Sequence, residues 1–294
     1  MSDAVAEETD LAVGALVDVL DLEQIDDDLF RGFSEDNGRG RSFGGQVAAQ
    51  ALMAAIETVG EEFFVHSMHS YFLLPGDPAH PTVYDVERIR DGRSFLTRRV
   101  SARQHGRPIY YLTANFHKAE EGFEHQDVMP DVVPPEQGID MLAILRDRTD
   151  PAGMRLVREW AAIDGRAVGH SLRGGLEPDD RHPARQRMWL RINGRLPDDP
   201  KIHIGAFTWA SDVSLLGAAL AAHTLDHDAV QMASLDHAIW FHRPFRADEW
   251  WLYDQVSPSA QGGRGLVIGR VFTQDGRLVA TTAQEGIIRP WRSQ

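Results

Sequence analysis

The sequence predicts an α+β fold built from two tandem copies of one unit, each a buried helix wrapped by an antiparallel sheet. Three observations lead to this prediction. The chain repeats itself at an offset of about 170 residues, each copy contains a hairpin pattern, and an alanine-rich stretch precedes each hairpin.

The repeat is visible in two pairs of matching segments. Ser70–Pro75 (SYFLLP) has the same aromatic-rich form as Ile239–Pro244 (IWFHRP), and Gln104–Arg107 (QHGR) corresponds to Gln274–Arg277 (QDGR). The two offsets differ by a single residue, which a loop insertion explains. We therefore expect a duplicated fold.

Alternating apolar residues flank each glycine-containing turn, which predicts hairpins made of Phe95–Ala102 with Ile109–Phe116 and of Leu266–Phe272 with Leu278–Ile287. The upstream stretches Gly45–Val59 and Ser211–Thr224 contain no proline and are too long for typical strands, so we expect helices. Apolar residues surround the first of these helices on nearly all sides, which predicts burial. Ser211 or Asp212 is the expected N-cap of the second helix.

A buried helix followed by antiparallel strands is the outline of a hotdog fold, and the repeat makes it a double hotdog. We expect a helical leader over residues 1–21, with Asp10–Leu20 at helical spacing, and a first repeat over 22–118. A connector rich in Pro, Asp and Arg would span 119–185 and contain a helix around Gly138–Trp160. The second repeat would occupy 186–294.

Composition excludes several classes of function. A chain of 294 residues with 43% hydrophobic content can bury a sizeable core, and a formal net charge of −14 disfavours non-specific binding to nucleic acid. The absence of cysteine removes disulfides, thiolate nucleophiles and Cys-ligated metals. No apolar run reaches the roughly 18 residues of a membrane span, and the first ten residues are acidic. We expect a cytoplasmic protein.

The sequence does not match common catalytic motifs. The nearest match to a nucleophile elbow, Gly169–Arg173 (GHSLR), lacks the closing glycine. The pairs His66 with His69 and His237 with His242 lack a helical metal-ligand spacing, and on a strand their members face opposite sides. We therefore expect neither a metal nor a nucleotide cofactor.

Five phrases of the sequence resemble the acyl-CoA thioesterase II family: FRGFSEDNGRGRSFGGQV, HSMHSYFLLPGD, DGRSFLTRRV, SLDHAIWFHRPF and TQDGRLVATTAQEG. The match runs in order from about Leu22 to Arg289 and is weakest in the connector. The resemblance implies a double-hotdog enzyme that hydrolyses acyl-CoA to free acid and coenzyme A.

The family's catalytic groups, carried over by motif, are an acid opening the second hotdog helix (Asp212), a hydroxyl (Ser234) and an amide (Gln284). The chemistry suits these residue types, because an activated thioester requires an oriented water and oxyanion stabilisation rather than a protein nucleophile. Asp212 would act as general base, while Ser234 and Gln284 would hold the water. The corresponding positions of the first repeat are Gln46 and Ala114, so we expect one site per chain.

Several alternatives stay open at this stage. His69 is the main alternative base, because histidine titrates near neutrality. Backbone N–H groups of Gly44 and Gly45 are candidate oxyanion donors. Five arginines could hold coenzyme A phosphates or lie on an ordinary solvated face, namely Arg88, Arg90, Arg93, Arg98 and Arg99.

Two other functions compete with hydrolysis. One is a non-catalytic acyl-CoA binding or sensing module. The other is a hotdog hydratase, which would carry a histidine about five residues after its aspartate, where this chain has Gly217. We also expect a homo-oligomer, because hotdog sheets commonly pair.

Overall fold

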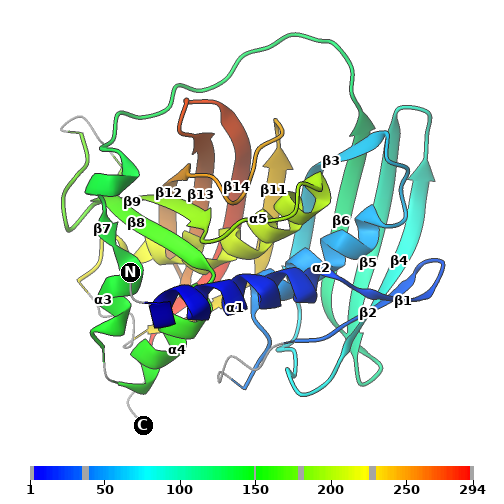
Figure 1. Cartoon of the computed structure of the whole chain (residues 1–294), viewed down its shortest axis with the longest axis horizontal. Helices are drawn as coiled ribbons and strands as arrows, with labels where there is room; N and C mark the ends of the chain where they lie inside the picture. Colours follow the sequence, from blue (N-terminus) through cyan, green and yellow to red (C-terminus); the bar gives the residue numbers. More distant parts are fainter. Residues whose placement is uncertain (1–2, 35–39, 149, 178–181, 225–229, 292–294) are drawn as a thin grey trace.

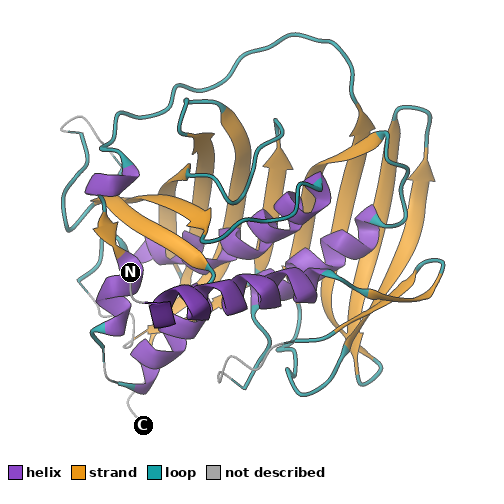
Figure 2. Cartoon of the chain, viewed as in Figure 1, coloured by secondary structure: helices purple, strands orange, loops and turns teal. Residues whose placement is uncertain are grey.

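The computed structural model describes residues 3–34, 40–148, 150–177, 182–224 and 230–291. Within these ranges one long antiparallel sheet forms a curved wall, and the helices lie together on one side of it (Figures 1 and 2). None of the described helices is both long enough and apolar enough to cross a membrane.

The described residues of the first half form two helices and six strands. They are α1 (Asp3–Leu20), β1 (Glu23–Asp26), β2 (Leu29–Gly32), α2 (Gly44–Ile56), β3 (Phe63–Phe72), β4 (Thr82–Asp91), β5 (Phe95–Gln104) and β6 (Arg107–Lys118). Beyond β6 a long extended segment crosses one edge of the molecule (Figure 1). It leads to η1 (Pro135–Gln137), β7 (Ile139–Asp140), α3 (Met141–Arg146) and α4 (Pro151–Trp160).

The rest of the chain contributes the other half of the sheet. Its elements are β8 (Ile163–His170), β9 (Ala184–Ile192), α5 (Pro200–Ser214), η2 (Leu215–Leu220), β10 (Val230–Ser234), β11 (Asp236–Phe241), β12 (Trp251–Gln261), β13 (Arg264–Thr273) and β14 (Leu278–Pro290). The strand order is β1-β2-β4-β5-β6-β3-β11-β14-β13-β12-β9-β8-β7, with β10 paired to β14.

The two halves join in mid-sheet, where β3 pairs with β11 and Ala238 lies opposite His69. These two residues are one repeat offset apart in the sequence, so an approximate twofold axis passes through this pair. The duplication read from the sequence therefore places equivalent strands next to each other and makes one continuous sheet.

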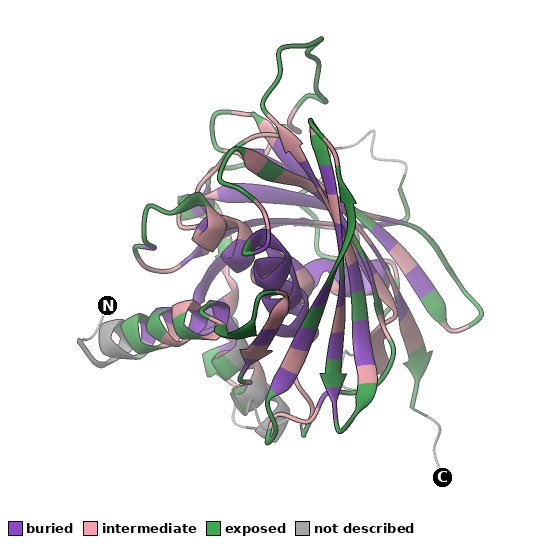
Figure 3. Cartoon of the chain, turned by 90° about the vertical axis from the view of Figure 1, so that its right-hand side faces the viewer, coloured by how far each residue is buried: buried purple, intermediate pink, exposed green. Residues whose placement is uncertain are grey.

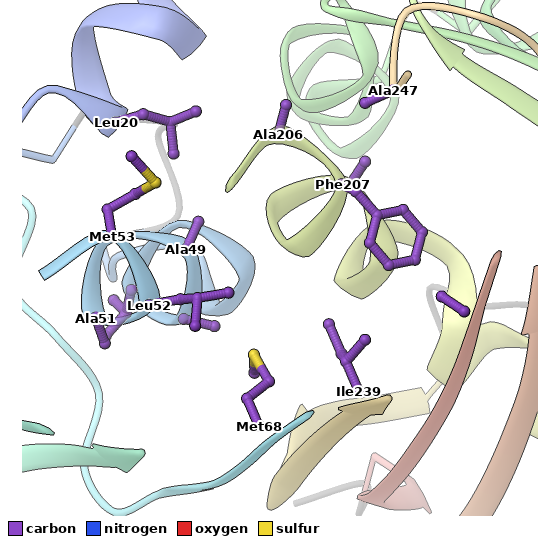
Figure 4. Close-up of a cluster of buried hydrophobic side chains, with 14 of the residues drawn as sticks. Leu20, Ala49, Ala51, Leu52, Met53, Met68, Ala206, Phe207, Ile239 and Ala247 are labelled. Atoms are coloured by element: carbon purple, nitrogen blue, oxygen red, sulfur yellow. The ribbon is translucent and has the colours of Figure 1, made fainter. Parts of the chain in front are cut away.

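Both central helices are buried between the sheet and the outer helices (Figure 3). In α2 every residue from Gly45 to Ile56 is buried, as its apolar composition predicts. The two helices run antiparallel, since Gly45 lies against the carbonyl of Trp209 while Gly205 contacts Met53. Figure 4 shows the core between them, where Leu52 and Phe207 point toward Met68 and Ile239 on the two joined strands.

The predicted hairpins and the first helix are confirmed. β5 and β6 form one hairpin, and β13 and β14 form the other. The leader helix α1 spans Asp3–Leu20, within the expected leader of residues 1–21. β8 lies within the predicted connector, and it extends the sheet by pairing with β9. The long segment before η1 is fixed to the second half, because Trp189 donates a hydrogen bond to the carbonyl of Val133 (2.9 Å).

The predicted start of the second helix is wrong. α5 begins at Pro200, where the ring favours the first helical position, and Asp199 is the N-cap, accepting a hydrogen bond from the Lys201 backbone N–H (2.9 Å). Ser211 and Asp212 therefore lie in the last turn of α5 and cap nothing. The chain continues as the 3₁₀ helix η2, so the predicted Ser211–Thr224 helix merged two distinct elements.

The single helix expected around Gly138–Trp160 is also wrong. The structure has two short helices there, α3 and α4, preceded by a short strand. Asp140 caps α3 by accepting a hydrogen bond from the Ala143 N–H (3.0 Å), and Pro151 begins α4. A proline disfavours helical geometry in the residue before it, which separates the two helices.

Candidate active site

The three side chains named by motif converge at one point, although they come from three elements. Asp212 is in the last turn of α5, Ser234 ends β10, and Gln284 is in the middle of β14. The amide nitrogen of Gln284 donates to Asp212 Oδ1 (2.5 Å) and to Ser234 Oγ (3.0 Å), and Ser234 Oγ donates to Asp212 Oδ1 (3.3 Å). One carboxylate oxygen thus receives two donors.

The second oxygen of Asp212 faces the start of α2. A Cβ built on Gly44 would lie 2.8 Å from Asp212 Oδ2, so only glycine fits there. The first backbone hydrogen bond of α2 runs from the Val47 N–H to the Phe43 carbonyl (3.2 Å). The preceding N–H groups, including those of Gly44 and Gly45, therefore have no acceptor within the helix, and the positive end of α2 lies beside the carboxylate.

Aromatic rings enclose this point. Phe72 contacts the Gly44 position and packs at 5.0 Å from the ring of Tyr110, while Phe43 meets Trp209 edge to face at 5.3 Å. The Tyr110 hydroxyl is buried and interacts with the Ser70 side chain, although no hydrogen bond of good geometry to it is found in the described residues. Burial raises the pKa of Tyr110, so the hydroxyl keeps its proton.

A buried histidine supports the end of α5 from the sheet side. His237 Nε2 lies 3.0 Å from Ser211 Oγ, and this hydroxyl donates to the Thr208 carbonyl (2.9 Å). The imidazole must therefore be the donor to Ser211. Burial lowers the pKa of His237, which keeps the ring neutral, although Asp212 and Asp236 act in the opposite direction. His237 thus fixes the residue next to Asp212.

The structure does not bring His69 to this group. His69 is exposed on the opposite face of the sheet, where its ring packs edge to face on Trp240 at 5.1 Å. The expected correspondence of Gln46 with Asp212 is wrong, because Gln46 lies in the first turn of α2 whereas Asp212 lies in the last turn of α5. Gln46 donates to the Phe33 carbonyl (2.9 Å), and Ala114 lies opposite Met68.

The arginines considered for phosphate binding are largely engaged with carboxylates. Arg88 pairs with Asp28 (2.9 Å), the buried Arg98 pairs with Asp91 (2.6 Å), and Arg99 pairs with Glu87. Three of the five arginines are thus paired with carboxylates of the first half.

Sequence reasoning missed Tyr110 and the link from His237 to Ser211. A tyrosine in an alternating strand is indistinguishable from a core residue, and only the folded chain places its hydroxyl near Asp212. Among the described residues, one group has metal-ligand geometry, namely Asp77, His80 and His105 in loops of the first half.

Comparison with known proteins identifies the family. Residues 34–117 match the model of the acyl-CoA thioesterase N-terminal domain, and residues 177–287 match the acyl-CoA thioesterase model. Human acyl-coenzyme A thioesterase 8 is 43% identical, over 95% of this chain and 90% of its own. Acyl-CoA thioesterase 2 of Haemophilus influenzae is 42% identical, over 93% and 96%.

Solved structures agree as well. The crystal structure of an acyl-CoA thioesterase II from Mycobacterium marinum superposes with a TM-score of 0.82 at 44% identity, over 94% of this chain and 98% of that one. A protein with hot dog fold from Alicyclobacillus acidocaldarius, 21% identical, superposes with a TM-score of 0.76 over 95% and 99%, which supports the fold alone. The fold is thus the predicted double hotdog, and the chain belongs to the acyl-CoA thioesterase family.

Proposed function

We propose that this protein hydrolyses acyl-CoA thioesters to a carboxylic acid and coenzyme A at Asp212, Ser234 and Gln284. The observation that carries the proposal is the convergence of an acid, a hydroxyl and an amide on one carboxylate oxygen, beside a helix N-terminus. Membership in the family supports the substrate class. A binding module would not need an oriented general base.

In the proposed reaction Asp212 accepts a proton from a water molecule whose oxygen attacks the thioester carbonyl carbon. Ser234 and Gln284 fix the carboxylate, which leaves Oδ2 to contact the water. The backbone N–H groups of Gly44 and Gly45 stabilise the oxyanion of the tetrahedral intermediate. Collapse of the intermediate breaks the C–S bond, and the proton held by Asp212 passes to the departing thiolate.

The site requires both halves of the chain. The acid, hydroxyl and amide come from the second repeat, whereas the N–H donors and the ring of Phe72 come from the first. This division supports one site per chain. We also propose that the repeats occupy residues 22–118 and 186–294, with residues 119–185 as the connector.

The test measures free-thiol release from acyl-CoAs of increasing chain length with a thiol-reactive dye. The protein contains no cysteine, so it adds no background. We expect Asp212→Asn to lower kcat by about 10²- to 10⁴-fold, the usual contribution of a general base. His69→Gln is the matched control, because His69 is the alternative base and is exposed, and it should leave kcat within about twofold of wild type.

Two outcomes would contradict the proposal. Loss of activity in His69→Gln with retention in Asp212→Asn would move the base to the other face of the sheet. Binding of acyl-CoA by the wild type without any thiol release would leave the binding module as the function.

We further propose a cytoplasmic homo-oligomer. Support for assembly comes from the outer face of the central strands, where Tyr111, Tyr71 and Trp240 are 41%, 62% and 36% exposed. Neighbouring aromatic side chains of this kind are typical of protein interfaces. Light scattering on the purified protein measures the mass. A monomer at all concentrations would contradict this proposal.

A further inference from the structure

A cluster of potential metal ligands lies in two loops of the first half, on residues that the proposed reaction does not use. Asp77 and His80 are in the loop between β3 and β4, and His105 is in the turn between β5 and β6. His80 Nδ1 is 2.8 Å from Asp77 Oδ2, and His105 Nε2 is 3.9 Å from the same oxygen. One donor atom from each residue fits within 4.8 Å.

These spacings are close to those of a metal site. Zinc binds imidazole nitrogen at about 2.0–2.1 Å and carboxylate oxygen at about 2.0–2.2 Å, so tetrahedral ligand atoms lie about 3.4 Å apart. The 2.8 and 3.9 Å distances lie on either side of this value. The side chains are about half exposed, so rotation about their torsions can adjust them without moving the backbone.

The backbone that carries the ligands is held by a buried amide. Gln104, directly before His105, is 6% exposed and accepts the Asp77 N–H (2.8 Å). Its amide nitrogen donates to the carbonyls of Asp77 and His80 (2.9 Å each) and to Thr82 Oγ1 (3.1 Å). One side chain thus fixes the loop of Asp77 and His80 against the turn of His105, so little ordering is required on binding.

Local backbone contacts also orient two of the three side chains, Asp77 and His105. Asp77 Oδ1 accepts the Ala79 N–H (2.9 Å), which leaves Oδ2 directed at the imidazoles. His105 has a positive φ of 49°, which is uncommon outside glycine, and it is followed by Gly106 with φ of 72°. This left-handed turn presents the His105 ring next to His80, with ring centroids 4.5 Å apart.

We propose that Asp77, His80 and His105 bind a first-row divalent metal ion such as Zn²⁺. Two imidazoles and one carboxylate favour zinc, nickel, cobalt or copper over magnesium or calcium, which prefer oxygen ligands. Three protein ligands leave a coordination position for water. The sequence could not reveal this site, because His80 and His105 are far apart along the chain and form no short motif.

The location gives the ion a structural role. It would join the β3–β4 loop to the β5–β6 turn, next to Gly76, whose carbonyl accepts the Ser42 N–H (2.8 Å). Ser42 lies two residues before Gly44 and the start of α2. Bound metal therefore restrains the segment that leads into the proposed oxyanion donors.

The test is isothermal titration of tag-free full-length protein with Zn²⁺, and with Mg²⁺ as a comparison. We expect one Zn²⁺ per chain and no Mg²⁺ binding. His80→Gln and His105→Asn should each weaken Zn²⁺ binding at least about tenfold, since losing a ligand costs no less than losing its supporting partner. Asparagine tolerates positive φ, so His105→Asn keeps the turn. The control is His223→Gln, an exposed histidine outside the cluster.

A second measurement separates this site from incidental binding. Zn²⁺ should slow hydrogen exchange in segments 76–82 and 104–107 of the wild type but not of His80→Gln. Zinc affinity that is unchanged in both cluster variants, or lost equally in His223→Gln, would overturn the proposal. Absence of Zn²⁺ binding at millimolar concentration would do the same.

Discussion

Replacing Gly45 with alanine tests the close contact between the two central helices. A Cβ at this position would lie 2.4 Å from the carbonyl oxygen of Trp209 and 2.6 Å from the ring of Phe43. The ring can rotate, but the backbone oxygen of α5 cannot. Reaching an ordinary contact of about 3.4 Å therefore requires the helices to separate by about 1 Å near Asp212.

Two opposing effects set the magnitude. Alanine is about 1 kcal/mol better than glycine in a helix, whereas overpacking a tight core costs about 1–3 kcal/mol. The added methyl group would be attached to the backbone of α2 and would press on the backbone of α5, so neither side can move away easily. We therefore expect an overpacking cost in the upper part of the range of about 1–3 kcal/mol. The net loss in the free energy of unfolding should be at least about 1 kcal/mol. A shift of about 1 Å between Asp212 and the N–H groups of α2 should lower kcat/KM by about 10²-fold.

The measurement is equilibrium unfolding in urea together with acyl-CoA hydrolysis. Gly14→Ala is the matched control, because Gly14 is an exposed position inside α1 and nothing lies within 4 Å of its added Cβ. This variant should be about 0.5–1 kcal/mol more stable than wild type with unchanged activity. If Gly45→Ala were as stable and active as Gly14→Ala, the proposed close packing of α2 on α5 would be refuted.

Other predictions concern buried polar groups. Tyr253→Phe removes the 2.8 Å hydrogen bond to Thr282 and should cost about 1–3 kcal/mol in urea unfolding. Tyr110→Phe removes a hydroxyl that interacts with Ser70 without a hydrogen bond of good geometry in the described residues, so it should cost less than Tyr253→Phe. Burial lowers the pKa of His203, whose Nδ1 accepts the Ala247 N–H (3.1 Å). Below about pH 6.5 His203 therefore binds a proton in the unfolded chain but stays neutral in the folded chain. The free energy of unfolding should then fall from pH 7 to pH 5, and it should fall less steeply in His203→Gln. Equal slopes for both proteins would contradict this assignment.

The sequence predicted the parts of the fold that repeat or alternate. Hairpins follow from a two-residue period, α2 follows from its apolar surface, and the duplication of the fold follows from the offset. It grouped Asp212 with Ser234 and Gln284, which lie together in the structure, but it placed Asp212 at the wrong end of its helix. The alanine-rich stretch after Ser211 is more helix-like than Pro200–Ala210, although proline and an aspartate cap favour the earlier start.

Contacts between residues far apart in the sequence could not be predicted, because no local pattern marks them. Asp254 is 1% exposed between Arg187 (2.8 Å) and Arg270 (2.5 Å), and nothing in strand alternation marks it as buried. Its partners are distant in the chain, so the charges compensate each other only after the sheet forms. The same holds for the proposed metal ligands of the first half, whose two loops are joined by the buried Gln104.

The antiparallel pairing of α2 and α5 also accounts for the single site proposed for this duplicated fold. It brings the end of α5 to the start of α2, where Asp212 faces Gly44, and it brings the end of α2 to the start of α5. At this second junction Glu57, which caps α2, forms an ion pair with Lys201 (3.1 Å). This ion pair lies at the second junction, and Ala114 stands at the position that corresponds to Gln284. Among the described residues, the proposed acid, hydroxyl and amide therefore meet at the first junction and not at the second.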